Sequence, residues 1–238
     1  MSYRDKIQAK VKDPQLMKHG EEIFDREFFG VCFKKYNREE LLGQCGWNKL
    51  VLKFIEKNVP FGDVSGKKVI DIGCGWGALP RVLKDRGFEV TATDISAFII
   101  KRAKKIQKDI DFRVEDVEKG IGAAGKFDYI FALEVLEHLK NPHKAVRNIK
   151  KKLREGGFFI FSTPYPNKWN KADPTHISIN YPEYWISLGK DLGFKEVSFK
   201  YATFIPFFYK YTNLFDWILP IRVDNRYINS TCFFFFKN

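Results

Sequence analysis

The stretch Lys68-Val69-Ile70-Asp71-Ile72-Gly73-Cys74-Gly75-Trp76-Gly77 governs how the rest of the chain is interpreted. It joins a short apolar run to three glycines at alternate positions, and a helical pattern follows. Glycine tolerates positive φ and lets the backbone approach a ligand closely, because it has no Cβ. A strand that passes through such a turn into a helix is typical of nucleotide-binding proteins. We therefore predict that a flat, polar ligand lies over this turn.

The residues around the glycines narrow the choice of ligand. Gly73, Gly75 and Ala78 satisfy the loose fingerprint of dinucleotide-binding folds. Asp71, two residues before the first glycine, argues against a pyrophosphate, because two negative groups would repel each other there. A ligand that carries an ammonium and a sulfonium would be stabilised by this carboxylate instead. In these residues the turn resembles motif I of the class I S-adenosylmethionine (SAM) methyltransferases.

Two more acids follow at the ends of the next predicted strands. Residues 89–94 form a strand pattern that ends in Asp94, and a carboxylate there can accept hydrogen bonds from both ribose hydroxyls. The alternative is that Asp94 caps the next helix, although Ser96 is the better placed cap. The resemblance implies that Asp116 accepts from the adenine amino group, with Glu115 as the open alternative. The expected cofactor-binding residues are Asp71, Gly73, Cys74, Gly75, Asp94, Ile95, Asp116, Val117 and Leu133.

The order of the predicted elements indicates an α/β fold. Strands alternate with helices from residue 68 to residue 162, which predicts a doubly wound, mostly parallel, Rossmann-like sheet. The resemblance implies seven strands, the last of them, residues 230–237, antiparallel to a strand at 195–201. We expect an N-terminal helical cap over residues 1–66 and a SAM-binding domain over residues 67–238. An aromatic insertion at 202–226 precedes the last strand.

A polar segment follows the predicted fourth strand, at the end of the sheet where α/β proteins bind ligands. Helical spacing would place Glu134, Glu137 and His138 around one point. Two carboxylates and an imidazole suit a divalent cation such as Mg²⁺ or Mn²⁺. This E-x-x-E-H pattern resembles the metal-binding segment of ubiquinone-type O-methyltransferases. It also resembles that of small-RNA 3′-terminal 2′-O-methyltransferases, in which His176 would be a further ligand.

A reading without a metal stays open. The glutamates then line the pocket or cap a helix, and His138 serves as a base or as a structural hydrogen-bond partner. In either reading we expect His138, Glu137 and His176 to be the catalytic residues, and Glu134, Glu137, His138 and His176 to be the candidate metal ligands.

Composition limits the partners and the compartment. The chain has 238 residues, with 41 Lys and Arg against 29 Asp and Glu, so its formal charge is +12. The basic clusters at 101–108 and 147–154 fall on predicted amphipathic helices and are expected to be solvated, so nucleic acid is not the expected partner. The four cysteines have no CxxC or zinc spacing. With no signal-like start and no run of 18 apolar residues, we expect a cytoplasmic protein.

The expected function is SAM-dependent methyl transfer to an oxygen or nitrogen of a small acceptor. A sugar, a quinone precursor or a lipid or envelope intermediate is the expected class, and the aromatic residues 204–221 offer contact with a membrane or a lipid-linked substrate. Two alternatives stay open: a metal-dependent 2′-O-methyltransferase of RNA 3′ ends, and a non-catalytic SAM-fold binding protein. The presence of the motif residues argues against the non-catalytic alternative; these are Asp71, Gly73, Gly75, Asp94 and Asp116. The sequence leaves the oligomeric state undetermined.

Overall fold

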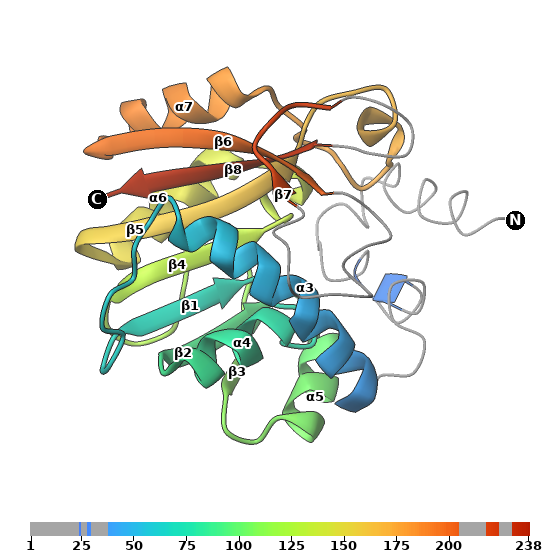
Figure 1. The fold of residues 1–238 in the computed structure, drawn as a ribbon, viewed down its shortest axis with the longest axis vertical. Helices are drawn as coiled ribbons and strands as arrows, with labels where there is room; N and C mark the ends of the chain where they lie inside the picture. The colour runs from blue at the N-terminus through green and yellow to red at the C-terminus, as the bar shows by residue number, and fades with distance from the viewer. Residues whose placement is uncertain (1–23, 25–27, 30–37, 205–217, 224–229) are drawn as a thin grey trace, which may run out of the picture.

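A computed structural model describes residues 24, 28–29, 38–204, 218–223 and 230–238 (Figure 1). Within these residues one eight-stranded sheet has the strand order β3-β2-β1-β4-β5-β8-β6-β7. The strands are β1 Lys68–Ile72, β2 Glu89–Asp94, β3 Asp111–Val114, β4 Phe127–Leu133, β5 Leu153–Pro164, β6 Glu196–Phe204, β7 Ile218–Leu219 and β8 Ser230–Lys237. The described α-helices longer than a turn are α3 Arg38–Glu56, α4 Ala78–Arg86, α5 Ala97–Ile106, α6 Pro142–Lys152 and α7 Pro182–Asp191.

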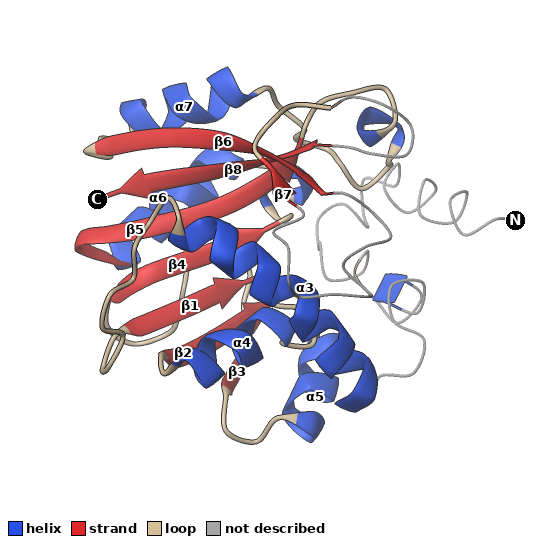
Figure 2. Cartoon of the chain, viewed as in Figure 1, coloured by secondary structure: helices blue, strands red, loops and turns tan. Residues whose placement is uncertain are grey.

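The sheet confirms the predicted fold class. Strands β1 to β5 pair in parallel, whereas β8 is antiparallel to both of its neighbours, β5 and β6. The two-residue strand β7 adds an eighth member, which pairs with the end of β6. Helices α4, α5 and α6 connect β1 to β2, β2 to β3 and β4 to β5, whereas a loop connects β3 to β4 (Figure 2). The carboxyl ends of β1, β2 and β4 therefore lie side by side.

Apolar side chains fill both faces of the sheet. Helices α3, α4 and α5 cover one face, where Ile55, Leu83 and Ile100 are buried in one core (Figure 1). Helices α6 and α7 cover the other face, where Ile149 and Trp185 are buried in a second core. The two cores hold the parallel strands rigidly, so the loops at their carboxyl ends have a fixed base.

Local signals set the helix ends: the sequence predicts Gly87 as a C-cap, Ser96 as an N-cap, and Asn141 as an N-cap followed by Pro142, and the structure confirms all three. Gly87 ends α4 with a φ of 108°, a conformation that favours glycine. The Ser96 side chain accepts a hydrogen bond from Ile99 N at the start of α5. The Asn141 side chain accepts from Lys144 N, and Pro142 opens α6.

Two boundaries differ from the sequence predictions. The sequence predicts separate helices at 38–42 and 48–57, but α3 is continuous, because packing of its apolar face against α4 outweighs the low helix propensity of Gly43 and Gly46. The sequence also predicts that Glu155-Gly156-Gly157 ends a helix, but these residues lie inside β5. The pairing of β5 with β4 shifts register there, and a Cβ on Gly157 would lie 2.8 Å from Asp128 O.

The predicted aromatic insertion at 202–226 is described only in part. Residues 202–204 continue β6, Ile218–Leu219 form β7, and most of the remainder lies outside the described residues. Within the described part of the chain, none of the helices has the length and apolar character that crossing a membrane requires.

Two helical glycines should respond in opposite directions to replacement by alanine. A Cβ on Gly189 of α7 would lie 2.6 Å from Phe236 Cε2, so G189A should lower the free energy of unfolding by about 1–3 kcal/mol. A Cβ on Gly46 of α3 would meet nothing within 4 Å, so G46A should raise it by about 0.5–1 kcal/mol. Urea unfolding measures both changes, and a stabilising G189A would contradict the packing of α7.

Candidate active site

A cavity of about 480 Å³ opens at the carboxyl ends of β1, β2 and β4. The residues expected to bind the cofactor all line it: Asp71, Gly73, Cys74, Gly75, Asp94, Ile95, Asp116, Val117 and Leu133. Its size falls within the range of small-molecule and cofactor sites. The sequence motifs, spread over more than 60 positions, are thus brought to a single surface.

The glycine turn takes its shape from contacts with other elements. Gly73 has a φ of 71°, and a Cβ there would overlap the side chain of Val135. Gly75 N donates a hydrogen bond of 2.9 Å to Asp94 Oδ2. Asp94 Oδ1 accepts from Ser96 N at 2.9 Å, so one carboxylate joins the glycine turn to the start of α5. Asp94 therefore shapes the cavity in addition to facing it.

The acidic groups at the base of the cavity are poorly solvated. Asp71 is 4% exposed, and burial followed by the charge of Asp94 raises its pKa well above the ordinary value. Burial also raises the pKa of Asp94 to about 6, although hydrogen bonds from backbone N–H groups oppose the shift. A bound cation would offset the unfavourable desolvation of these carboxylates. The electrostatics of the cavity thus favour a positively charged ligand group.

Glu115 and Asp116 both line the part of the cavity beyond β3. Asp116 Oδ1 accepts a hydrogen bond from Glu118 N at 3.0 Å, and Asp116 Oδ2 lies 3.3 Å from Lys119 Nζ. Glu115 Oε2 is buried and has no hydrogen-bond partner among the described residues. Either acid can therefore accept from a nucleobase amino group, so the alternative raised by the sequence stays open.

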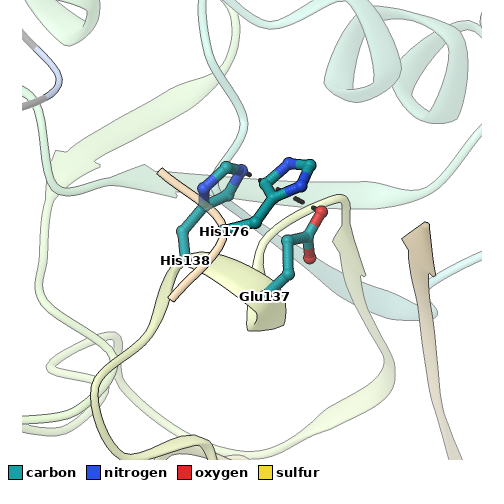
Figure 3. Close-up of side chains that lie close together, drawn as sticks. All are labelled: Glu137, His138 and His176. Carbon is teal, nitrogen blue, oxygen red and sulfur yellow. Dashed lines mark ion pairs between the residues drawn. The ribbon is translucent and has the colours of Figure 1, made fainter. Parts of the chain in front are cut away.

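Glu137, His138 and His176 converge from two segments, as Figure 3 shows. Their potential ligand atoms all lie within 4.8 Å of one another. Glu137 and His138 belong to a 3₁₀ turn at Leu136–His138, and His176 follows a second turn after β5. His138 Nδ1 lies 2.9 Å from Thr175 O, and His176 Nδ1 lies 2.8 Å from Asn170 O. These carbonyls require a proton on each Nδ1, which leaves each Nε2 as an acceptor or ligand.

The electrostatic state of this cluster suits a cation. Glu137 is fully buried, and neither carboxylate oxygen has a hydrogen-bond partner among the described residues. Burial, followed by the charge of Glu134, raises the pKa of Glu137 well above its ordinary value. Burial and the neighbouring His176 lower the pKa of His138 to about 4, so its imidazole is neutral at pH 7. A buried carboxylate that lacks hydrogen-bond partners among the described residues, beside two imidazoles, fits a divalent metal ion.

Glu134 does not join this cluster. The prediction assumed helical geometry from Glu134 onward. The 3₁₀ turn starts only at Leu136 and Glu134 has a φ of 55°, so the chain does not bring Glu134 into the cluster. Its Oε1 instead accepts a hydrogen bond from Ser162 Oγ at 2.7 Å, and its side chain lines the cavity. Among the described residues, the cluster therefore contains one carboxylate rather than the two that the sequence pattern suggested.

Several cavity residues were not identified from the sequence. Gln44 and Asn48 of α3 line the cavity one helical turn apart, and Gln44 Oε1 accepts a hydrogen bond of 2.7 Å from Trp76 Nε1 in the glycine turn. Gln107 Nε2 donates to the backbone oxygens of Trp76 and Gly77 from the other side. Polar residues on a predicted helix carry no local signal of such contacts, so only the tertiary fold identifies them.

The raised pKa of Glu134 means that its ionised form should lower the stability of the fold. Desolvation raises the pKa of Glu134 to about 7, although the residue is exposed at the surface, so folding takes up protons and the ionised group destabilises the fold as pH rises from about 4.5 to about 7. Glu134→Gln retains an acceptor for Ser162 without the charge. The variant should match the wild type near pH 4 and be more stable at pH 8 in urea unfolding. Equal stability at pH 8 would contradict this assignment.

The fold is similar to those of solved methyltransferase structures. Magnesium protoporphyrin IX methyltransferase from Synechocystis PCC 6803, solved with S-adenosylhomocysteine (SAH), superposes with a TM-score of 0.64 at 17% identity, covering 95% of this chain and 100% of that one. Plantazolicin methyltransferase BpumL, also solved with SAH, gives a TM-score of 0.59 at 16% identity, covering 99% and 95%. At these identities the two structures support the fold alone.

Curated relatives share more sequence over a shorter span. Ubiquinone biosynthesis O-methyltransferase of Coxiella burnetii is 35% identical over 120 residues, which are 49% of this chain and 50% of the relative. The enzyme of the same name from Chromobacterium violaceum is 35% identical over 121 residues, 49% and 51% of the two chains. The chain thus spans about half the length of the curated relatives that it matches.

The match to a protein-family profile covers more of the chain than the matches to these relatives do. A profile of a methyltransferase domain family matches residues 33–208, a span that includes the glycine turn, Asp94, Asp116 and the Glu137 cluster. The chain therefore belongs to the methyltransferase domain family.

Proposed function

We propose that this protein transfers the methyl group of SAM to an oxygen of a small acceptor, and that Glu137, His138 and His176 hold a divalent cation beside that oxygen. The observation that carries the proposal is the buried Glu137 carboxylate, whose oxygens lack hydrogen-bond partners among the described residues and lie beside two correctly polarised imidazoles. Oxygen as the methylated atom is supported by the O-methyltransferase names of the curated relatives.

Different residues of the cavity have different roles in the proposed reaction. When bound, SAM supplies an electrophilic methyl group, so the protein has mainly to position the acceptor. Asp71 and Asp94 present negative charge to the cationic cofactor, and the carboxylate of Asp94 can accept from a ribose. A divalent cation would lower the pKa of an acceptor hydroxyl and fix its direction. The Nδ1 hydrogen bonds of His138 and His176 keep both imidazoles turned toward that position.

The walls of the cavity favour an acceptor with an apolar ring. Phe24, Phe28 and Phe29 line it together with Leu139 and Ile177. A ring with adjacent hydroxyls, as in a quinone precursor, would place its carbon skeleton against these residues and its oxygens toward the cation. A sugar or a lipid or envelope intermediate remains within the proposed acceptor class. Contact of residues 204–221 with a membrane or lipid-linked acceptor is supported by the exposure of Leu219 and Ile221.

One observation favours a second candidate function. His176 does join the cluster, as the resemblance to the 2′-O-methyltransferases of RNA 3′ ends implied. A terminal ribose also offers adjacent oxygens. The aromatic wall makes this the weaker proposal. We also propose a cytoplasmic location, which the free thiols of the described cysteines Cys45, Cys74 and Cys232 support.

Metal binding and methyl transfer test the proposal together. Mn²⁺ should bind saturably to chelator-treated, SAH-saturated protein in a calorimetric titration, and Glu137→Gln and His176→Asn should weaken binding by at least about 100-fold. His143→Asn on α6 is the matched control and should bind as the wild type does. With SAM and Mn²⁺, catechol should be methylated and resorcinol, whose hydroxyls are not adjacent, should not. A wild type that binds no Mn²⁺ would exclude the metal site.

The role of Asp94 can be tested with the cofactor product alone. Asp94→Ala should weaken SAH binding by about 1.5–3 kcal/mol, because a charged acceptor is lost. Asp111→Ala, at the start of β3 and outside the cavity lining, should leave the affinity unchanged. Calorimetry measures both affinities, and circular dichroism checks the fold. Unchanged SAH binding by a folded Asp94→Ala variant would exclude Asp94 from the cofactor site.

A further inference from the structure

Glu134 is held in a strained backbone conformation. Among the residues that the structure describes, it is the one non-glycine residue with a positive φ, 55°, and it follows directly on β4. The left-handed region is unfavourable for an L-residue, because Cβ comes too close to the following carbonyl oxygen. Such strain persists where surrounding contacts fix the conformation, and it concentrates at functional sites. The contacts that fix Glu134 therefore indicate the functional role of this backbone conformation.

Ser162 of β5 supplies those contacts at both ends of Glu134. The Glu134 N–H donates to Ser162 O and to Ser162 Oγ, each at 3.1 Å. The Ser162 hydroxyl in turn donates to Glu134 Oε1 at 2.7 Å. Ser162 is 1% exposed, and its register opposite Leu133 is set by the pairing of β4 with β5. One buried hydroxyl thus fixes both the backbone and the carboxylate of Glu134.

The result is a glutamate that lines the cavity with one carboxylate oxygen anchored. The described hydrogen bond to Ser162 involves Oε1, so Oε2 is available to a ligand. Glu134 and His138 both line the cavity, and Glu134 lies two residues before the turn at Leu136–His138 that carries Glu137. The wall beside the cluster therefore presents a second carboxylate, from a position that helical spacing alone would not give.

We propose that Ser162 is a positioning residue, which holds Glu134 so that its carboxylate supports the cation site at Glu137, His138 and His176. The inference rests on the proposed function, because it assigns a further part of the same site. Carboxylates that serve a metal are commonly held by a second hydrogen-bonding partner, and loss of such a partner lowers metal affinity by about 10–100-fold. A Ser162 that only stabilised the sheet would change stability and leave the affinity unchanged.

Calorimetric titration of Mn²⁺ into SAH-saturated protein tests the assignment. Ser162→Ala should bind Mn²⁺ about 10–100-fold more weakly, while Ser162→Thr, which keeps the hydroxyl, should restore most of the affinity. SAH affinity should stay within about twofold in both variants, since the glycine turn is untouched. The matched control is Ser187→Ala, which removes a surface hydrogen bond from Ser187 Oγ to Asp191 and should have no effect.

A double variant separates positioning from general destabilisation. Glu134→Gln should weaken Mn²⁺ binding at least as much as Ser162→Ala, and the two changes together should weaken it no further than Glu134→Gln alone. Thermal unfolding checks that each variant is folded. Full Mn²⁺ affinity in folded Ser162→Ala or Glu134→Gln, with binding lost in Glu137→Gln, would overturn this inference and leave the proposed function standing. No Mn²⁺ binding by the wild type would overturn the metal site and this inference with it.

Discussion

Buried negative charge at the carboxyl ends of β1, β2 and β4 is the constraint on which the rest of the site depends. Desolvation raises the pKa values of Asp71, Asp94, Glu134 and Glu137, and repulsion by a neighbouring carboxylate adds to the shift at Asp71 and Glu137. A fold that keeps such groups sacrifices stability for function. This loss of stability is explained if the carboxylates bind cations in the functional state of the protein. In the proposed function, the cationic cofactor would lie near Asp71 and Asp94, and the metal ion would bind Glu137 with Glu134 beside it.

The same carboxylates also hold the backbone that surrounds them. Asp94 accepts from Gly75 N in the glycine turn and from Ser96 N at the start of α5, so the cofactor site and the helix share one group. Gln44 and Gln107 reach the neighbouring Trp76 from α3 and from the end of α5. A turn built from left-handed glycines has few internal hydrogen bonds, and these side chains replace them.

The sequence predicted features that are encoded locally, and it failed where partners come from distant segments. Gly87, Ser96 and Asn141 were identifiable because a cap depends on three or four neighbouring residues. The sequence correctly grouped Glu137 with His138 and His176, but it took Glu134 for part of the same helical turn. Its actual conformation depends on the β4–β5 register that brings Ser162 opposite Leu133, and no spacing within 134–138 encodes that pairing.

The segment that follows β4 would allow the proposed cofactor and cation sites to act together. Leu133 lines the cavity at the end of the strand, Glu134 comes next, and Glu137 and His138 occupy the turn immediately beyond. Methyl transfer requires the acceptor oxygen to lie about 3–3.5 Å from the methyl carbon and in line with the departing sulfur. A short, rigid connection from a buried strand fixes the distance between the two sites better than a flexible loop would. The strain at Glu134 is then the cost of turning the chain sharply enough to place both sites on one wall.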